Sequence, residues 1–141
     1  MQRLFLFALM FTANAFAGVE GKWAGDGTLS SAEGARSQCS QMSVQIQVTA
    51  KKLSFAQGSF VCEGNTLHWQ PMSFEVRGST LWRDGLQVGT HSGDALTLSF
   101  PMGSETWIEV NATREGNRLQ WTLRNRDTDS QTVFQAQLQK R

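Results

Sequence analysis

The sequence predicts an all-β protein, an antiparallel up-and-down β-barrel of about ten strands. From residue 18 onward, apolar and polar residues alternate over most segments, and no stretch keeps the 3.6-residue period of a helix. Short turn sequences rich in Gly, Asp and Asn separate these segments. A sheet of this size buries its apolar face and pairs both of its edges by curling until the last strand meets the first. A two-sheet β-sandwich is the alternative, because periodicity does not distinguish it from a flattened barrel.

Residues 1–17 have the pattern of a cleaved signal peptide. A positive charge at Arg3 precedes the apolar run Leu4 to Phe11, and Ala15-Phe16-Ala17 gives the small-residue pattern of a cleavage site. The run is too short to span a bilayer as a helix, so we expect an exported protein, periplasmic or extracellular, without a membrane span. Removing 17 of the 141 residues leaves 124, which predicts a single domain over residues 18–141.

The expected mature chain has no net charge. The whole sequence contains 13 basic and 12 acidic side chains, and Arg3 is removed with the signal peptide. No run of Lys or Arg is present after it. Nucleic acids and anionic membrane surfaces are recognised by clustered positive charge, so we expect neither as a partner.

Turn sequences predict the strand pairing. Asp84-Gly85 suits a two-residue type I′ turn, which pairs Arg83 with Leu86 and Leu81 with Val88. With Ser92-Gly93-Asp94 as a three-residue loop, the same arithmetic places Leu98 opposite Val88, Ile108 opposite Leu98, Val110 opposite Trp121 and Trp121 opposite Ala136. The ten expected strands span about 18–29, 39–49, 52–62, 66–77, 80–84, 86–91, 95–100, 106–113, 118–125 and 132–140, with a bulge at Pro71.

The two cysteines are expected to form a disulfide. In a long hairpin over residues 41–61, Val48 lies opposite Leu53, and the same register makes Cys39 and Cys62 direct cross-strand partners. An even cysteine count in an exported protein favours the bridge. Alternation places both cysteines, together with Phe60, on the outer face of the sheet.

The resemblance to a known family rests on Gly21-Lys22-Trp23, a G-x-W pattern on the first strand, combined with the meander of strands. In these features the chain resembles the calycin superfamily, which includes lipocalins and fatty-acid-binding proteins. The resemblance implies a cup for a small hydrophobic ligand. The alternative is that the inward side chains only fill the core, as in other small barrels. The ligand-binding candidates inside the barrel are Trp23, Phe55, Trp69, Phe74 and Trp121.

Arg83 is the polar exception among the inward positions. The turn at Asp84-Gly85 gives Arg83 the same face as Leu81 and Leu86. A buried guanidinium needs a partner, and the carboxylate of a ligand matches its two-pronged geometry. The alternative is that Arg83 lies at the rim, where it reaches water or pairs with an acidic side chain of the protein.

The outward positions predict a second kind of binding. Trp82 and Trp107 face outward, which indicates a surface for a protein partner unless neighbouring side chains cover the rings. No nucleophile motif or inward pair of acids is present, and His68 and His91 lack the spacing of metal ligands, so we expect no enzyme, metal or cofactor. Two functions remain: a binding protein for a small hydrophobic ligand, and an interaction module such as the periplasmic lysozyme inhibitors.

Overall fold

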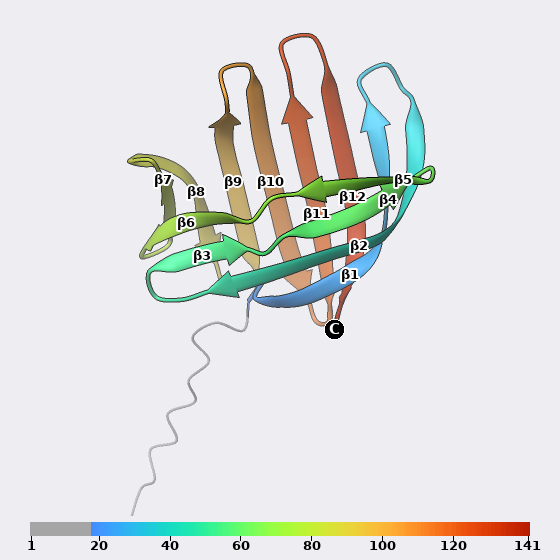
Figure 1. The fold of residues 1–141 in the computed structure, drawn as a ribbon. Helices are drawn as coiled ribbons and strands as arrows, with labels where there is room; N and C mark the ends of the chain where they lie inside the picture. Colours follow the sequence, from blue (N-terminus) through green and yellow to red (C-terminus); the bar gives the residue numbers. More distant parts are fainter. Residues whose placement is uncertain (1–17) are drawn as a thin grey trace, which may run out of the picture.

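The computed structural model describes residues 18–141, and these residues form twelve β-strands and no helix (Figure 1). The expected signal peptide lies outside the described residues. The strands are β1 (Gly21–Ser31), β2 (Arg36–Val48), β3 (Lys52–Phe55), β4 (Gly58–Cys62), β5 (Asn65–Trp69), β6 (Met72–Arg77), β7 (Thr80–Arg83), β8 (Leu86–Ser92), β9 (Ala95–Met102), β10 (Thr106–Glu115), β11 (Arg118–Arg126) and β12 (Gln131–Lys140).

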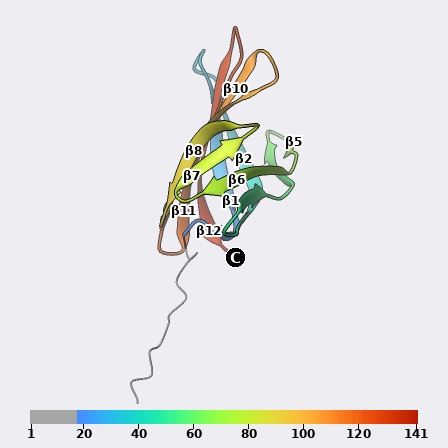
Figure 2. The ribbon, with the colours of Figure 1, turned by 90° about the vertical axis from the view of Figure 1, so that its left-hand side faces the viewer.

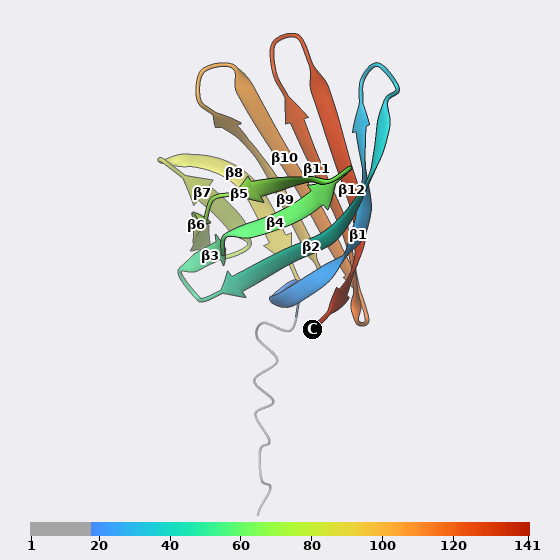
Figure 3. The same ribbon diagram turned by 45° about the vertical axis from the view of Figure 1, so that its right-hand side comes forward.

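Ten of the twelve described strands close into an antiparallel barrel, which confirms the expected fold class and is consistent with a calycin-like fold. The order runs β1-β12-β11-β10-β9-β8-β7-β6-β3-β2, and β2 pairs again with β1. The remaining two strands, β4 and β5, form a hairpin that continues the sheet from β2. This hairpin crosses in front of β11 and β12 in Figures 1 and 3, and Figure 2 views the barrel from the side of β6, β7 and β8.

The barrel interior is filled by side chains from every part of the wall. Trp23 is fully buried, and its indole N–H donates to the Val19 carbonyl at 2.9 Å. Gly27 lets β12 come close to β1, since a methyl group at this position would lie 2.4 Å from the Gln135 carbonyl oxygen. Twelve large side chains are fully buried: Trp23, Met42, Ile46, Leu53, Phe74, Leu81, Leu96, Leu98, Phe100, Leu119, Phe134 and Leu138.

The pairing around the Asp84-Gly85 turn is partly as expected. Arg83 pairs with Leu86 as predicted, but Leu81 pairs with Gly89 because a bulge lies between Leu81 and Trp82. The prediction that Leu81 lies opposite Val88 is therefore wrong. On its other side, Gly89 lets β9 come close to β8, because a side chain there would collide with the Thr97 carbonyl oxygen of β9.

The pairing of β8 with β9, β9 with β10 and β10 with β11 differs from the expected pairing by one or two residues. Gly89, and not Val88, pairs with Leu98, because the turn between β8 and β9 leaves only Gly93 and Asp94 unpaired. Two other expected pairs, Ile108 with Leu98 and Val110 with Trp121, are wrong by two residues: Ile108 pairs with Phe100, and Val110 pairs with Leu123. The pairs Trp121 with Ala136 and Val48 with Leu53 are confirmed.

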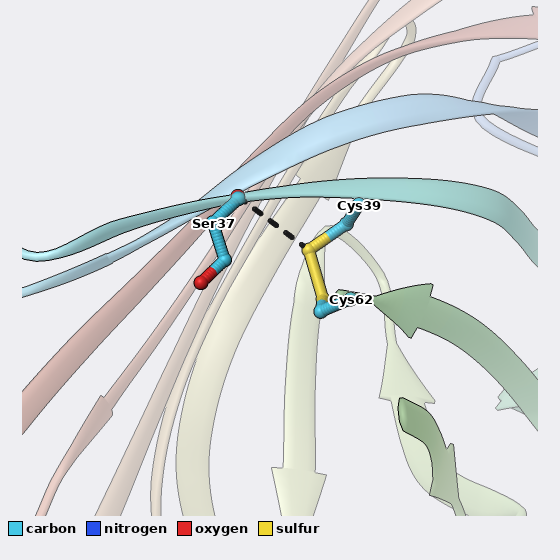
Figure 4. The surroundings of a disulfide bond; sticks show 3 residues. All are labelled: Ser37, Cys39 and Cys62. Atoms are coloured by element: carbon cyan, nitrogen blue, oxygen red, sulfur yellow. Dashed lines mark hydrogen bonds between the residues drawn. A yellow bond between two sulfur atoms is a disulfide. The ribbon is translucent and has the colours of Figure 1, made fainter. Parts of the chain in front are cut away.

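The disulfide is present, but it lies inside and not outside. Cys39 and Cys62 are paired across β2 and β4 with their Cα atoms 4.1 Å apart (Figure 4). Both are buried, and Phe60 packs against the core as well. The outward placement was wrong because Gln41 adopts a φ of 56° at an irregularity in β2. A one-residue bulge reverses the alternation of faces beyond it.

Each of two expected strands is divided in two. The segment 52–62 breaks at Ala56-Gln57, so β3 pairs with one half of β2 and β4 with the other. The segment 66–77 breaks at Gln70-Pro71, the position expected for a bulge. The β4–β5 hairpin is therefore joined to the barrel through two short links.

Candidate functional site

Four of the aromatic candidates lie in the packed interior. Trp23, Phe55, Phe74 and Trp121 each expose 4% or less of their surface. The ring of Phe55 stands edge-on to Phe74 at 6.2 Å and to Trp121 at 6.0 Å. Burial against other core side chains fits the core-packing interpretation of these four positions, and Phe74 also lines a hollow beside β6 and β7. Their role in ligand binding stays a prediction.

Trp69 holds the β4–β5 hairpin in place. Its indole N–H donates to the Ala56 carbonyl at 3.1 Å, and its ring packs 5.9 Å from that of Phe60. Phe60 in turn stacks on Phe134 of β12 at 4.6 Å. Gly58, which pairs with Trp69 across the hairpin, leaves the space that the indole occupies. Trp69 therefore has a structural role that alternation did not predict.

Arg83 lies at the last position of β7, where the Asp84-Gly85 turn directs it toward the rim of the barrel. Both turn residues have positive φ, 52° and 78°, as the type I′ turn requires. The guanidinium carbon lies 5.1 Å from the centre of the Phe100 ring. Nε is 4.0 Å from the Asp84 carboxylate, which is 92% exposed, so water screens this pair.

One end of the Arg83 guanidinium has no protein partner. Its Nη1 atom is buried and makes no hydrogen bond within the described part of the chain. The side chain as a whole is 33% exposed, so its other end is accessible. A buried donor without a partner is destabilising, so each such group calls for an explanation, and a bound acceptor is one of them. Arg83 therefore lies at the rim and also points toward the interior, two placements that the sequence left as alternatives.

Two hollows meet at Arg83. The first, which we name the rim hollow, has a volume of about 190 Å³ and is lined by Leu86, Val88, Phe100 and Met102 together with Arg83 and Asp84. Leu86 and Met102 expose 62% and 41% of their surface. The second, which we name the wall gap, lies between β6 and β7 and measures about 530 Å³. It is lined by Lys52, Met72, Ser73, Trp82, Arg83 and Asp84, among others.

The two outward tryptophans do not form one surface. Trp82 is half-buried beneath the Arg77 guanidinium at 4.4 Å, and its N–H donates to Thr80 Oγ1 at 2.9 Å. Trp107 on β10 is 38% exposed and donates to Ser99 Oγ at 2.7 Å. Strands β8 and β9 separate the two residues.

The charge that covers Trp82 is itself paired. Arg77 donates to the two carboxylate oxygens of Glu75 at 3.0 and 3.2 Å. These hydrogen bonds lower the pKa of Glu75 and raise the pKa of Arg77. Glu75 therefore contributes little free negative charge to the wall gap beside it.

Sequence reasoning missed the exposed apolar side of the rim hollow. Leu86 shares the inward face in the expected register, yet it lies next to a turn at the barrel end, where no neighbouring strand covers it. In the sequence, the exposure of Leu86 is indicated by its position directly after the Asp84-Gly85 turn.

Comparison of the chain with protein families, with curated proteins and with solved structures gave no match. Within residues 18–141, no helix is long and apolar enough to cross a membrane.

Proposed function

We propose that this is an exported calycin-like binding protein, and not an enzyme, that takes a small apolar molecule with a carboxylate at the rim hollow. The observation that carries the proposal is Arg83, whose Nη1 is buried without a partner beside an apolar hollow. A carboxylate accepts paired hydrogen bonds from a guanidinium, while Leu86, Val88 and Met102 offer contacts to an apolar group. The buried disulfide supports an oxidising compartment.

The size of the rim hollow limits the ligand. About 190 Å³ corresponds to roughly six water molecules at about 30 Å³ each. The barrel interior below it is occupied by fully buried side chains such as Phe74 and Phe100. A short or aromatic acid therefore fits this hollow better than a long-chain fatty acid.

The test is a titration of matched small molecules by calorimetry and NMR. Benzoate and hexanoate should bind saturably, and hexanol, which lacks the charge, should bind more weakly. Arg83→Met keeps the length of the side chain and should weaken benzoate binding about 10- to 100-fold, the effect of losing a hydrogen bond to a charged group. Arg36→Met, on the exposed end of β2, is the control. Equal affinity of the wild type and Arg83→Met would refute the proposal.

A second candidate is an interaction module that uses the outer surface, and the exposure of Leu86 and Trp107 favours it. A small inhibitor barrel needs no internal ligand, which agrees with the packed interior. The test is the inhibition of a c-type lysozyme by the wild-type protein and by Leu86→Asp and Trp107→Ser. Saturable inhibition that either substitution abolishes supports this candidate, and no inhibition by the wild type excludes lysozyme as the partner.

A further inference from the structure

The barrel wall is incomplete between β6 and β7. Only Glu75, Val76 and Arg77 of β6 pair with β7, because β7 ends at Arg83 and turns away into β8. On its other side, β6 pairs with β3 from Met72 to Glu75. Residues 72–74 therefore have a neighbouring strand on one side only, and the wall gap occupies the other side.

The backbone of Ser73 faces this gap. The Val76 N–H donates to the Lys51 carbonyl at 2.9 Å, on the side of β3. Backbone groups of an antiparallel strand alternate in direction, so those of Phe74 point toward β3 and those of Ser73 point away from it. Ser73 is exposed. One residue of β6 thus offers an N–H and a carbonyl oxygen to an incoming strand.

The charges around the gap favour a carboxylate near Arg83. Lys52 and Arg83 contribute positive charge, and the negative charge of Glu75 is held by Arg77. The Asp84 carboxylate is 92% exposed and well hydrated. Arg83 also belongs to both hollows, so one group bound to it can reach the rim hollow and the wall gap together.

We propose that the carboxylate ligand is the C-terminal residue of an extended peptide. This rests on the proposed function and specifies its ligand class. The terminal carboxylate binds Arg83, the last side chain enters the rim hollow, and the preceding backbone pairs with Ser73 as an added strand. Trp82 and Met72, which line the wall gap, flank the peptide.

The form of the wall gap suits a peptide better than an acyl chain. Its volume of about 530 Å³ falls in the usual range of ligand sites. A free acid leaves the backbone groups of Ser73 bound only to water, whereas a peptide satisfies both. Recognition by strand addition takes affinity from the main chain and specificity from side-chain pockets. Here the pocket is small and apolar, which selects a terminal residue such as Leu or Val.

Three synthetic ligands separate the contributions. The first is an acetylated tetrapeptide ending in Leu with a free carboxylate, the second is its C-terminal amide, and the third is N-acetyl-leucine. We expect the free tetrapeptide to bind about tenfold more tightly than either of the others, because each of them lacks one set of hydrogen bonds. Hydrogen exchange at the Ser73 amide should slow when the free tetrapeptide binds.

The backbone pairing is tested from both sides. Methylation of the peptide nitrogen that faces Ser73 should remove the tenfold gain without altering the protein. Ser73→Pro removes the N–H and should have the same effect, whereas Ser73→Ala keeps the N–H and should retain the gain. Equal affinities for the tetrapeptide and N-acetyl-leucine, with unchanged exchange at Ser73, would overturn the peptide proposal. That result leaves the carboxylate site intact, while a failure of every carboxylate to bind overturns the proposed function itself.

Discussion

The disulfide gives the most quantitative test of the structure. It joins β2 of the barrel to β4 of the appended hairpin, and both cysteines are buried. We consider the double substitution Cys39→Ala and Cys62→Ala, because alanine introduces no buried hydroxyl group. Strand β2 keeps its pairing with β1 and β3 in this variant, so the closed barrel does not depend on the bridge.

The expected loss of stability follows from the length of the closed loop. The cysteines are 23 residues apart, and the loop-entropy relation gives about 3.4 kcal/mol at 25 °C. Unfolding entropy is about 2.1 cal/mol/K per residue, so the described part of the chain should lose about 13 °C in melting temperature. Calorimetry measures both quantities.

Hydrogen exchange shows where the stability is lost. Amides of the β4–β5 hairpin should exchange faster in the double variant, because only non-covalent contacts then fix the hairpin against the barrel: the stacking of Phe60 on Phe134, the hydrogen bond from Trp69 to Ala56 and the pairing of β4 with β2. Amides of β9, β10 and β11 should keep their relative protection. A melting temperature within about 3 °C of the wild type would refute the loop estimate. Loss of protection in every strand at 25 °C would refute the independence of the barrel.

Three further predictions concern single side chains. Gln41→Gly should raise the free energy of unfolding in urea by about 0.5–1 kcal/mol, because Gln41 has a φ of 56°, a strained conformation for any residue other than glycine. The control, Gln47→Gly in the regular part of β2, should lower the free energy of unfolding. The same change in stability for both variants would contradict backbone strain at Gln41. Arg77→Met should raise the pKa of Glu75 in an NMR titration; since the wild-type pKa is lowered, the stabilisation by this exposed pair is present above the ordinary glutamate pKa and is lost as the pH falls through the lowered one. Gly58→Ala should destabilise the protein by about 1–3 kcal/mol, because its methyl group would lie 1.9 Å from the facing indole, and unchanged thermal stability would contradict that packing.

The alternation of apolar and polar residues predicted the face of the sheet that each side chain occupies more reliably than it predicted the cross-strand partners. The expected partners of Ile108 and Val110 were wrong by two residues, yet both side chains are buried as expected. A two-residue shift preserves the face, so the hydrophobic pattern alone does not determine the register. The lengths of the turns determine the register, and where several loop lengths were compatible with the sequence, the register could not be predicted.

Bulges account for the remaining errors in the fold. Nothing in the sequence around Gln41 distinguishes it from the other glutamines of the strand, and so the inward position of Cys39 was missed. The cysteine pair was still found, because the irregularities on β2 and between β3 and β4 compensate each other and restore the original register. The pairing of Arg83 with Leu86 was predicted correctly because the turn dipeptide permits few alternatives. The wall gap depends on where β7 ends relative to β6, which only the structure shows.

The end of the sheet at β5 has a consequence for the concentrated protein. Each of the ten barrel strands in the described chain has neighbours on two sides, whereas β5 pairs with β4 alone. Residues 65–68 are exposed and carry no acidic or basic group other than His68, and Pro71 follows shortly after. When two copies of the molecule pair through their β5 strands, the unpaired edge of β5 is covered in both copies. Such self-association stops at two molecules, so the fold does not template the growth of a fibre through this strand.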